Sequence, residues 1–207
     1  VNQTFGQQGC EAARAAIAAA GGTVVDTETH EVTDTNLTSK VLGLKNKGVE
    51  GIMAFTFPNT GVVLFNQLAD NGVDVPVMTG AIAGLATSTG SVKPAGIKDL
   101  YGFDDCAPAV EDRAKQFAAA YRAKFAGKNP SYSAAQAYDS LSIIKQAVEK
   151  AGSNDKDAIA AALKSTDYEG ACVHYKADDG NGLSQSAVLE TFDAKGTPKV
   201  VKTVPLS

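Results

Sequence analysis

The feature that most constrains the fold is an alternation of short apolar runs with helical patterns over the first half of the chain. The stretch 51–61 reads GIMAFTFPNTG, in which four residues suited to a buried strand are followed by Pro58. Proline cannot continue a strand ladder, and the following GVVLFNQLADNG has helical spacing and a turn signal at its end. Apolar strands separated by helices and short loops are typical of parallel βαβ units, so the sequence predicts an α/β fold.

The same reading assigns the remaining elements. Helices are expected over residues 5–20, 34–47, 59–70, 111–125, 132–151 and 155–164. Strands are expected over residues 23–25, 52–55, 75–78, 100–106, 171–175, 187–192 and 199–204. Asn59 or Thr60, and Ser153 or Asn154, are expected to cap helices. Residues 81–96 are rich in small residues and predict a long loop. In the helix 132–151, the expected apolar stripe consists of Tyr138, Leu141, Ile144 and Val148.

Composition excludes several classes of function. The 207 residues carry a formal net charge of −4, which gives no electrostatic basis for binding nucleic acid or an anionic membrane. No window is apolar enough to span a membrane, and the opening VNQTFGQQG lacks the pattern of a signal peptide. Neither GxGxxG after a strand nor GxxxxGK[ST] nor GxSxG occurs, so we expect no nucleotide cofactor and no nucleophile elbow.

The three cysteines do not form a metal motif, because they are far apart and include no CxxC pair. Cys10 is expected to be a buried thiol on a helix. Cys106 and Cys172 lie in strand-like stretches and can pair in an oxidising compartment, which the sequence leaves open. His174 lies two residues after Cys172, so a Cys–His hydrolase is an alternative, although no oxyanion-binding device is visible.

Four stretches resemble one family in the order in which they occur. FGQQGCEAARAAIAAAGGTVV is similar to the segment that opens the second lobe of type I periplasmic solute-binding proteins of ABC transporters, especially the branched-chain amino acid (Leu/Ile/Val-type) group. VEGIMAFTFPNTGVVLFNQLADNGVDVPVMTG resembles the next strand, helix and strand. NPSYSAAQAYDSLSIIKQAVEKAG resembles the long helix after the chain returns to the first lobe, and YEGACVHYKADDGNG resembles the late strand and turn.

The resemblance implies two Rossmann-like parallel-sheet lobes joined by a hinge. Residues 1–106 then form the second lobe, residues 107–187 a mostly helical part of the first lobe, and residues 188–207 strands that cross back. Family members begin with a first-lobe βαβ series that has no counterpart here. We therefore expect a carboxyl-terminal portion of a larger protein, whose missing amino-terminal lobe is a partner and leaves a sheet flank exposed.

The ligand site is expected beyond the carboxyl ends of the parallel strands. Thr56 and Phe57 follow one such strand, Ala81 follows the strand VPVM, and Phe5 follows the truncated first strand. The resemblance implies that Phe5 touches the ligand and that Thr56 lines the pocket, in a cleft between the lobes. Tyr132, at the start of its helix, is the candidate from the first lobe.

Ala81 departs from the family pattern. Amino acid binders of this group carry a carboxylate at this position, which pairs with the ligand ammonium. A buried ammonium without a partner costs on the order of several kcal/mol. Either another acidic group replaces that carboxylate, or the ligand is a small carboxylate, an amide or an aromatic acid.

The function implied by the resemblance is solute capture by hinge closure, with no bond made or broken. The closed form would be read by the membrane permease of an ABC transporter, in the periplasm or outside the cell, with or without a lipid anchor. A ligand-sensing receptor domain of the same fold is the first alternative, and the Cys–His hydrolase is the least favoured one.

Overall fold

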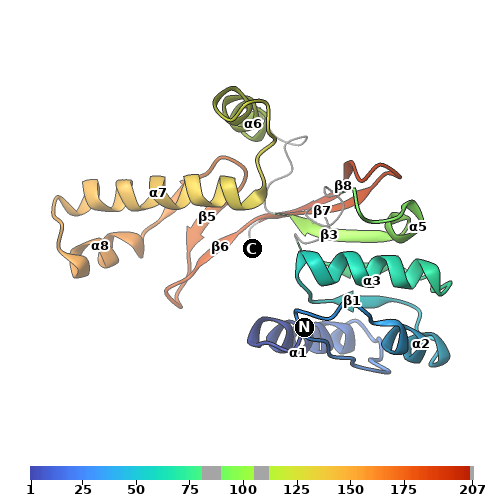
Figure 1. Cartoon of the computed structure of the whole chain (residues 1–207). Coiled ribbons are helices and arrows are strands. Elements are labelled where there is room, and N and C mark those ends of the chain that lie inside the picture. The colour runs from blue at the N-terminus through green and yellow to red at the C-terminus, as the bar shows by residue number, and fades with distance from the viewer. Residues whose placement is uncertain (81–89, 105–111, 206–207) are drawn as a thin grey trace. The chain divides into compact units, whose positions relative to one another are not determined.

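The computed structural model describes residues 1–80, 90–104 and 112–205. The chain divides into two compact units, which are described separately. Unit 1 comprises Val1–Phe103 and Glu190–Lys199, and unit 2 comprises Asp104–Leu189 and Val200–Ser207. Figure 1 traces the elements of both units along the chain.

Unit 1 begins with two helices, after which helix and strand alternate. In chain order its elements are α1 (Thr4–Ala19), α2 (Thr38–Asn46), β1 (Ile52–Ala54), α3 (Pro58–Asp70), β2 (Val77–Thr79), α5 (Pro94–Ile97) and β3 (Leu100–Asp104). Strands β7 (Ala187–Phe192) and β8 (Pro198–Val204), each with residues in both units, complete a five-stranded sheet in the order β1-β2-β3-β7-β8. Strands β1, β2 and β3 are parallel, which confirms the predicted fold class and brings their carboxyl ends to one edge of the sheet.

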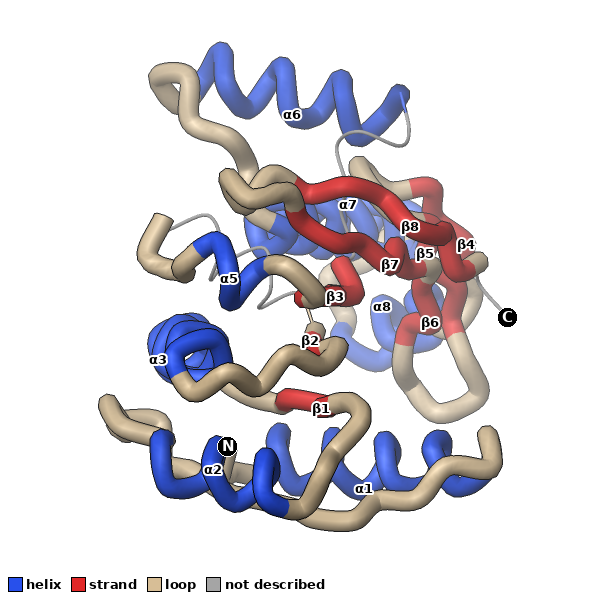
Figure 2. Tube along the Cα trace, turned by 90° about the vertical axis from the view of Figure 1, so that its right-hand side faces the viewer, coloured by secondary structure: helices blue, strands red, loops and turns tan. Residues whose placement is uncertain are grey.

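The core of unit 1 forms where helices cover the apolar strands. Phe65 and Leu68 of α3 are buried together with Val41 of α2, and Val77 and Leu100 of the sheet belong to the same cluster. The tube in Figure 2 shows α3 and α5 on one side of the strands. This packing removes a continuous apolar surface from water and holds the strand ends in place.

Unit 2 is built differently. Its helices are α6 (Asp112–Lys124), α7 (Tyr132–Ala151) and α8 (Lys156–Leu163), and its strands β4 (Asp167–Glu169), β5 (His174–Ala177) and β6 (Leu183–Gln185) form an antiparallel sheet. The register pairs Tyr168 with Tyr175. The core contains Ala135 and Ile143 of α7 together with Val173 and Tyr175.

The start of α8 differs from the sequence prediction. The cap is Asp155 and not Ser153 or Asn154, because its carboxylate accepts the backbone N–H groups of Asp157 at 3.1 Å and Ala158 at 2.9 Å. An acidic cap satisfies two of the free donors of the first turn and also complements the helix dipole.

Other predictions were wrong in detail. Asn59 and Thr60 do not cap α3, because the helix begins at Pro58 and Phe57 occupies the cap position. Residues 23–25 form no strand, and the predicted helix from Asp34 begins only at Thr38. The short strands β4 and β6 were not predicted, because neither contains the apolar alternation that identifies a strand. Residues 81–89 of the predicted long loop lie outside the described part of the chain.

None of the described helices is both long and apolar enough to cross a membrane.

Candidate functional site

Two aromatic side chains meet beside the carboxyl end of β1. Phe5 lies in the first turn of α1, and Phe57 lies just before α3. Their ring centroids are 5.9 Å apart, and Phe55 approaches Phe5 edge-on at 6.3 Å. Phe5 is 53% exposed and Phe57 is 37% exposed. This aromatic pair, Phe5 and Phe57, presents ring surface to solvent on which an apolar or aromatic ligand could pack.

Thr56 helps to position Phe57 of the aromatic pair through hydrogen bonds. Its side chain is buried, and its hydroxyl lies 2.6 Å from that of Thr60. The Thr60 hydroxyl donates to the carbonyl oxygen of Phe57 at 3.3 Å, so Thr56 donates to Thr60. This chain of hydrogen bonds fixes the first turn of α3 to the end of β1 and thereby positions Phe57. A direct contact between Thr56 and a ligand stays a prediction.

The helices that carry the aromatic pair begin without side-chain caps. Neither Gln3, before α1, nor Phe57, before α3, accepts a capping hydrogen bond through its side chain. The first backbone N–H groups of a helix then need another acceptor, and the helix dipole favours an anion at this end. The surroundings of the aromatic pair are therefore compatible with a carboxylate.

The neighbouring strand end is tied to β1 as well. Thr79, the last residue of β2, is buried and donates its hydroxyl to the carbonyl oxygen of Ala54 at 2.7 Å. Ala81, two residues later, lies outside the described residues. Tyr132 is the first residue of α7 in unit 2, and its side chain is not described. The structure thus brings together Phe5, Thr56 and Phe57, and the roles of Ala81 and Tyr132 stay predictions.

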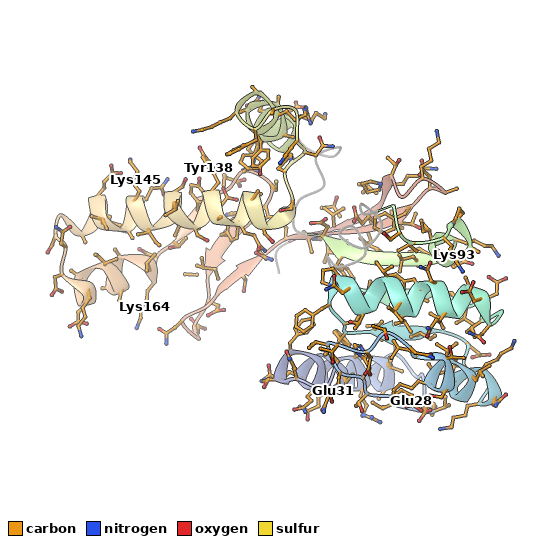
Figure 3. All side chains as sticks on the ribbon, viewed as in Figure 1. Glu28, Glu31, Lys93, Tyr138, Lys145 and Lys164 are labelled. Carbon is orange, nitrogen blue, oxygen red and sulfur yellow. The ribbon has the colours of Figure 1, made fainter. Side chains whose placement is uncertain are left out.

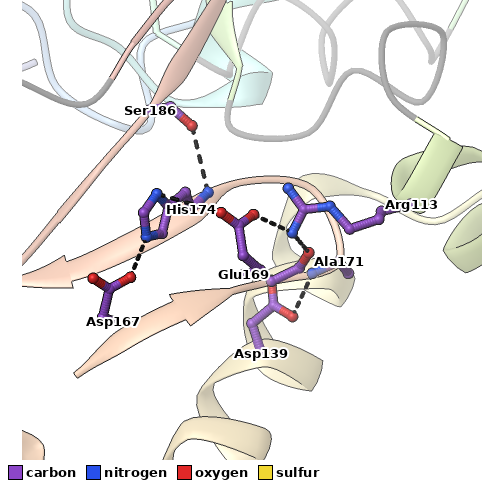
Figure 4. A network of polar contacts seen from close by, with 8 residues as sticks. Arg113, Asp139, Asp167, Glu169, Ala171, His174 and Ser186 are labelled. Carbon is purple, nitrogen blue, oxygen red and sulfur yellow. Dashed lines mark hydrogen bonds and ion pairs between the residues drawn. The ribbon is translucent and has the colours of Figure 1, made fainter.

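A polar network in unit 2 surrounds the turn between β4 and β5 (Figure 4). Arg113 of α6 forms an ion pair with Glu169 at 2.5 Å and donates to the carbonyl oxygen of Gly170 at 3.0 Å. Asp139 of α7 accepts the N–H of Ala171 at 2.8 Å. Burial raises the pKa of Asp139, opposed by the hydrogen bonds from Ala171 and Tyr175 and by the Arg113 charge. The network anchors the turn to two helices.

The hydrolase alternative depends on Cys172 and His174, which lie beside this network. Cys172 is disulfide-bonded, whereas Cys10 is a free, half-buried thiol. The predicted partner, Cys106, lies outside the described residues. The ring of His174 pairs through Nε2 with Asp167 at 2.6 Å. A disulfide sulfur is not a thiolate nucleophile, so this arrangement does not provide the activated group that the alternative requires.

In the described ranges, no group of three or more His, Cys, Asp or Glu side chains is arranged to hold a metal ion. Unit 1 offers three features on which a function can be based: parallel strand ends, exposed aromatic rings and uncapped helix starts.

Comparison with known proteins decides the family. A family model described as periplasmic binding protein matches residues 1–197. The chain belongs to the periplasmic binding protein family. This confirms the resemblance noted in the sequence. No curated protein matches the sequence significantly.

Solved structures share the fold of this periplasmic binding protein. A solute-binding protein of Rhodopseudomonas palustris, in complex with p-hydroxybenzoic acid, has a TM-score of 0.84 and 19% identity over 97% of this chain and 57% of its own. A leucine-binding protein of Thermotoga maritima has a TM-score of 0.77 and 19% identity, with coverages of 91% and 53%. A branched-chain amino acid transporter substrate-binding protein of Streptococcus pneumoniae, in complex with isoleucine, has a TM-score of 0.74 and 25% identity, with coverages of 89% and 52%. The chain thus spans just over half the length of these structures.

Sequence reasoning missed part of what supports the site in this periplasmic binding protein. The partnership of Thr56 with Thr60 was not predicted, although the spacing of four residues across a strand-to-helix turn was a usable signal. In unit 2, the roles of Arg113 and Asp139 were missed as well. No local pattern identifies them, because each acts on a turn more than 30 positions away.

Proposed function

We propose that this periplasmic binding protein is the solute-binding component of an ABC transporter and captures a small carboxylate or amide outside the cytoplasm. The observation that carries the proposal is the exposed aromatic pair, Phe5 and Phe57, at the carboxyl edge of a parallel sheet. Open α/β sheets bind ligands at this edge. Capture by closure changes no bond in the solute, and the permease of the transporter is the expected partner of the closed form.

The chemistry of the site favours an aromatic carboxylate over an α-amino acid. Ring surface on Phe5 and Phe57 can pack against an aromatic solute, and the uncapped starts of α1 and α3 can accept a carboxylate. Ala81 cannot pair with an ammonium group. One of the similar structures holds p-hydroxybenzoic acid and another holds isoleucine, so both classes of solute occur on this fold.

The test is a thermal-shift screen of the full-length protein with benzoate, 4-hydroxybenzoate, benzamide, leucine and isoleucine. A solute present at 100 times its dissociation constant stabilises the folded state by about 2.7 kcal/mol, which gives a clear rise in Tm. We expect the aromatic carboxylates to give the largest rise. Stabilisation by leucine or isoleucine alone would contradict the aromatic assignment, while stabilisation by none of the five would contradict the proposed solute class.

Calorimetric titration of variants then locates the site. Phe57→Ala is expected to weaken binding of the stabilising solute about tenfold, which corresponds to about 1.4 kcal/mol of lost ring contact. Phe125→Ala is the matched control, because Phe125 is 45% exposed and also packs on an aromatic neighbour, but lies in unit 2. Equal weakening by both variants would argue against the aromatic pair as the site.

A further inference from the structure

A third phenylalanine, Phe55, lies against Phe5 of the aromatic pair. The strand expected over residues 52–55 includes Phe55, but β1 ends at Ala54, and Phe55 is only half-buried. Its ring centroid is 6.3 Å from that of Phe5, and the two ring planes are inclined at 78°. The planes of Phe5 and Phe57 are inclined at only 32°. Phe5 thus contacts one ring edge-to-face and a second ring that is closer to parallel.

The segment after β1 presents two of these three rings on one side. Burial alternates along it, with Ala54 and Thr56 buried and Phe55 and Phe57 more exposed, as in an extended segment with one face inward. Phe55 and Phe57 therefore share the side opposite Thr56. The hydrogen bond between the Thr56 and Thr60 hydroxyls anchors the segment from its buried side.

Gly9 of α1 leaves room for the Phe55 ring. A Cβ atom at Gly9 would lie 2.7 Å from both Cγ and Cε1 of Phe55, and closer still to Cδ1. Carbon atoms in contact are about 3.5–4.0 Å apart, so even an alanine at this position would displace the ring. Glycine is less favourable than alanine inside a helix. The close approach of the Phe55 ring explains why glycine occurs in the interior of α1.

Phe5 and Gly9 lie on the same face of α1, because they are four residues apart. A side chain at position 9 would point toward the amino end of the helix, over the turn that carries Phe5. Glycine leaves this space free, and the Phe55 ring fills it. Figure 1 shows α1 beside β1, from whose end Phe55 reaches the helix. A residue outside α1 thus supplies the neighbour of Phe5.

This edge contact restricts the orientation of the Phe5 ring. Phe5 is 53% exposed, so much of its surface has no protein neighbour to hold it. Contact between aromatic rings depends on orientation, because offset and edge-to-face arrangements are favoured. Burial of an aliphatic group depends on area and is non-directional. A Phe5 ring that is oriented in advance therefore favours an aromatic solute more than an aliphatic one.

We propose that Phe55 is a positioning residue, which sets the orientation of the Phe5 ring and makes the site select aromatic carboxylates over aliphatic carboxylates of similar size. Gly9 acts with Phe55 by leaving space for its ring. This role rests on the proposed function, because it assigns the specificity of the same aromatic pair. Phe55 acts on the solute through Phe5.

Calorimetric titration of the full-length protein with benzoate and with cyclohexanecarboxylate tests the proposal. The two solutes have the same charge and the same carbon skeleton, but only benzoate has an aromatic ring. We expect the wild type to bind benzoate about tenfold more tightly. Phe55→Leu keeps an apolar side chain without a ring, and should weaken benzoate binding about tenfold while changing cyclohexanecarboxylate binding less than about twofold. Equal weakening for both solutes, or no change for either, would overturn the proposal.

Glycine variants test the contact between α1 and Phe55. Gly9→Ala should reduce the preference for benzoate as Phe55→Leu does, because the added Cβ displaces the ring. In the Phe55→Leu background it should have no further effect on this preference. Gly43→Ala is the matched control, because Gly43 is also half-buried within a helix, α2, but a Cβ there would meet only a Glu28 oxygen at 3.6 Å. An equal loss of preference in Gly43→Ala would contradict the role of Phe55. If Phe55→Leu does not fold, Gly9→Ala alone decides.

The wild type separates this proposal from the proposed function. A wild type that binds neither solute contradicts the aromatic carboxylate of the proposed function, and the role of Phe55 falls with it. A wild type that binds both equally tightly keeps a small carboxylate as the solute but overturns selection through Phe55. A preference for benzoate that survives Phe55→Leu overturns the positioning role and leaves the proposed function standing.

Discussion

The two units differ in how they cover their main apolar helices. In unit 1, α3 buries Phe65 and Leu68 against the parallel sheet. In unit 2, α7 buries Ala135 and Ile143, but its Tyr138, Leu141 and Ile144 are 56%, 71% and 49% exposed. Of these three, Tyr138, which is labelled on α7 in Figure 3, lies against Phe117 of α6, with ring centroids 5.5 Å apart. The apolar face of α3 is thus covered by the sheet, whereas α7 has one apolar face that is covered and one that is exposed.

The difference shows that apolar periodicity identifies a helix but not the face that is buried. The apolar stripe expected for α7 contained Tyr138, Leu141 and Ile144, and these residues form the exposed face. The buried side instead carries Ala135, Ile143, Ala147 and Asp139, and the Asp139 carboxylate bonds to the turn before β5. A helix with apolar residues on two faces is patterned for two neighbouring layers, and the described residues supply one of them.

The largest expected effect compares the two helices directly. Phe65→Ala should cost about 3–5 kcal/mol of unfolding free energy, because Phe65 is 1% exposed and its removal leaves a cavity in the core of unit 1. Leu141→Ala on α7 should change it by about 0.5 kcal/mol or less, since that side chain is already in water. Urea denaturation of the 207-residue chain measures both. Comparable losses would show that the open face of α7 is covered in solution.

Much of the fold was predictable because it depends on local pattern. Apolar periodicity predicts the strand β1, the helix α3 and the bounds of α7. Pro58 marks the point at which the strand ends and the helix begins. The segment 23–25 was wrongly predicted as a strand, because a strand also requires a hydrogen-bonded neighbour. The strands β4 and β6 were missed for the converse reason: they exist through pairing with β5 and not through their own composition.

The candidate site was predictable to a similar extent. The expectation that Phe5 and Phe57 follow strand ends at one edge rests on the geometry of parallel sheets, and the two rings are in contact. The inward orientation of Thr56 was not predictable, because it depends on the Thr60 hydroxyl in the next helix. Packing of this kind is decided by side-chain positions that a sequence pattern does not contain.

The second-largest expected effect is a loss of stability in unit 2 when its disulfide is reduced. Reducing the disulfide of Cys172 should destabilise unit 2 by about 2–5 kcal/mol, because the cross-link limits the freedom of the unfolded chain. Amide exchange should accelerate at Val173 and Tyr175 in the core of unit 2, with little change at Phe65 in unit 1. Cys10→Ser is the matched control and should have no such effect, because Cys10 is free. Equal acceleration in both units would mean that they unfold as one cooperative body.

The smallest expected effect is a pH dependence confined to unit 2. Burial raises the pKa of Asp139 above its ordinary value of 3.8, so the native state holds this proton more tightly than the unfolded state does. The resulting stabilisation is fully present below pH 3.8 and is lost as the pH rises through the raised pKa. The Asp139→Asn variant has no ionisable group at this position, so its unfolding free energy does not fall for this reason as the pH rises. The unfolding free energy of the wild type, relative to that of Asp139→Asn, should therefore fall as the pH rises.

Denaturation of both proteins at a series of pH values from about 3 to 7 measures this difference, and exchange at Phe65 reports whether unit 1 takes part. The direction in which this free-energy difference changes with pH is informative, because two influences oppose each other at Asp139. Burial favours the neutral acid, whereas Arg113 and the bonds from Ala171 and Tyr175 favour the carboxylate. A wild type that gains stability relative to the variant as the pH rises would show that the carboxylate is the better-stabilised form. The turn before β5 would then be held by an ionised Asp139, and unit 2 would depend on charge where unit 1 depends on its apolar core.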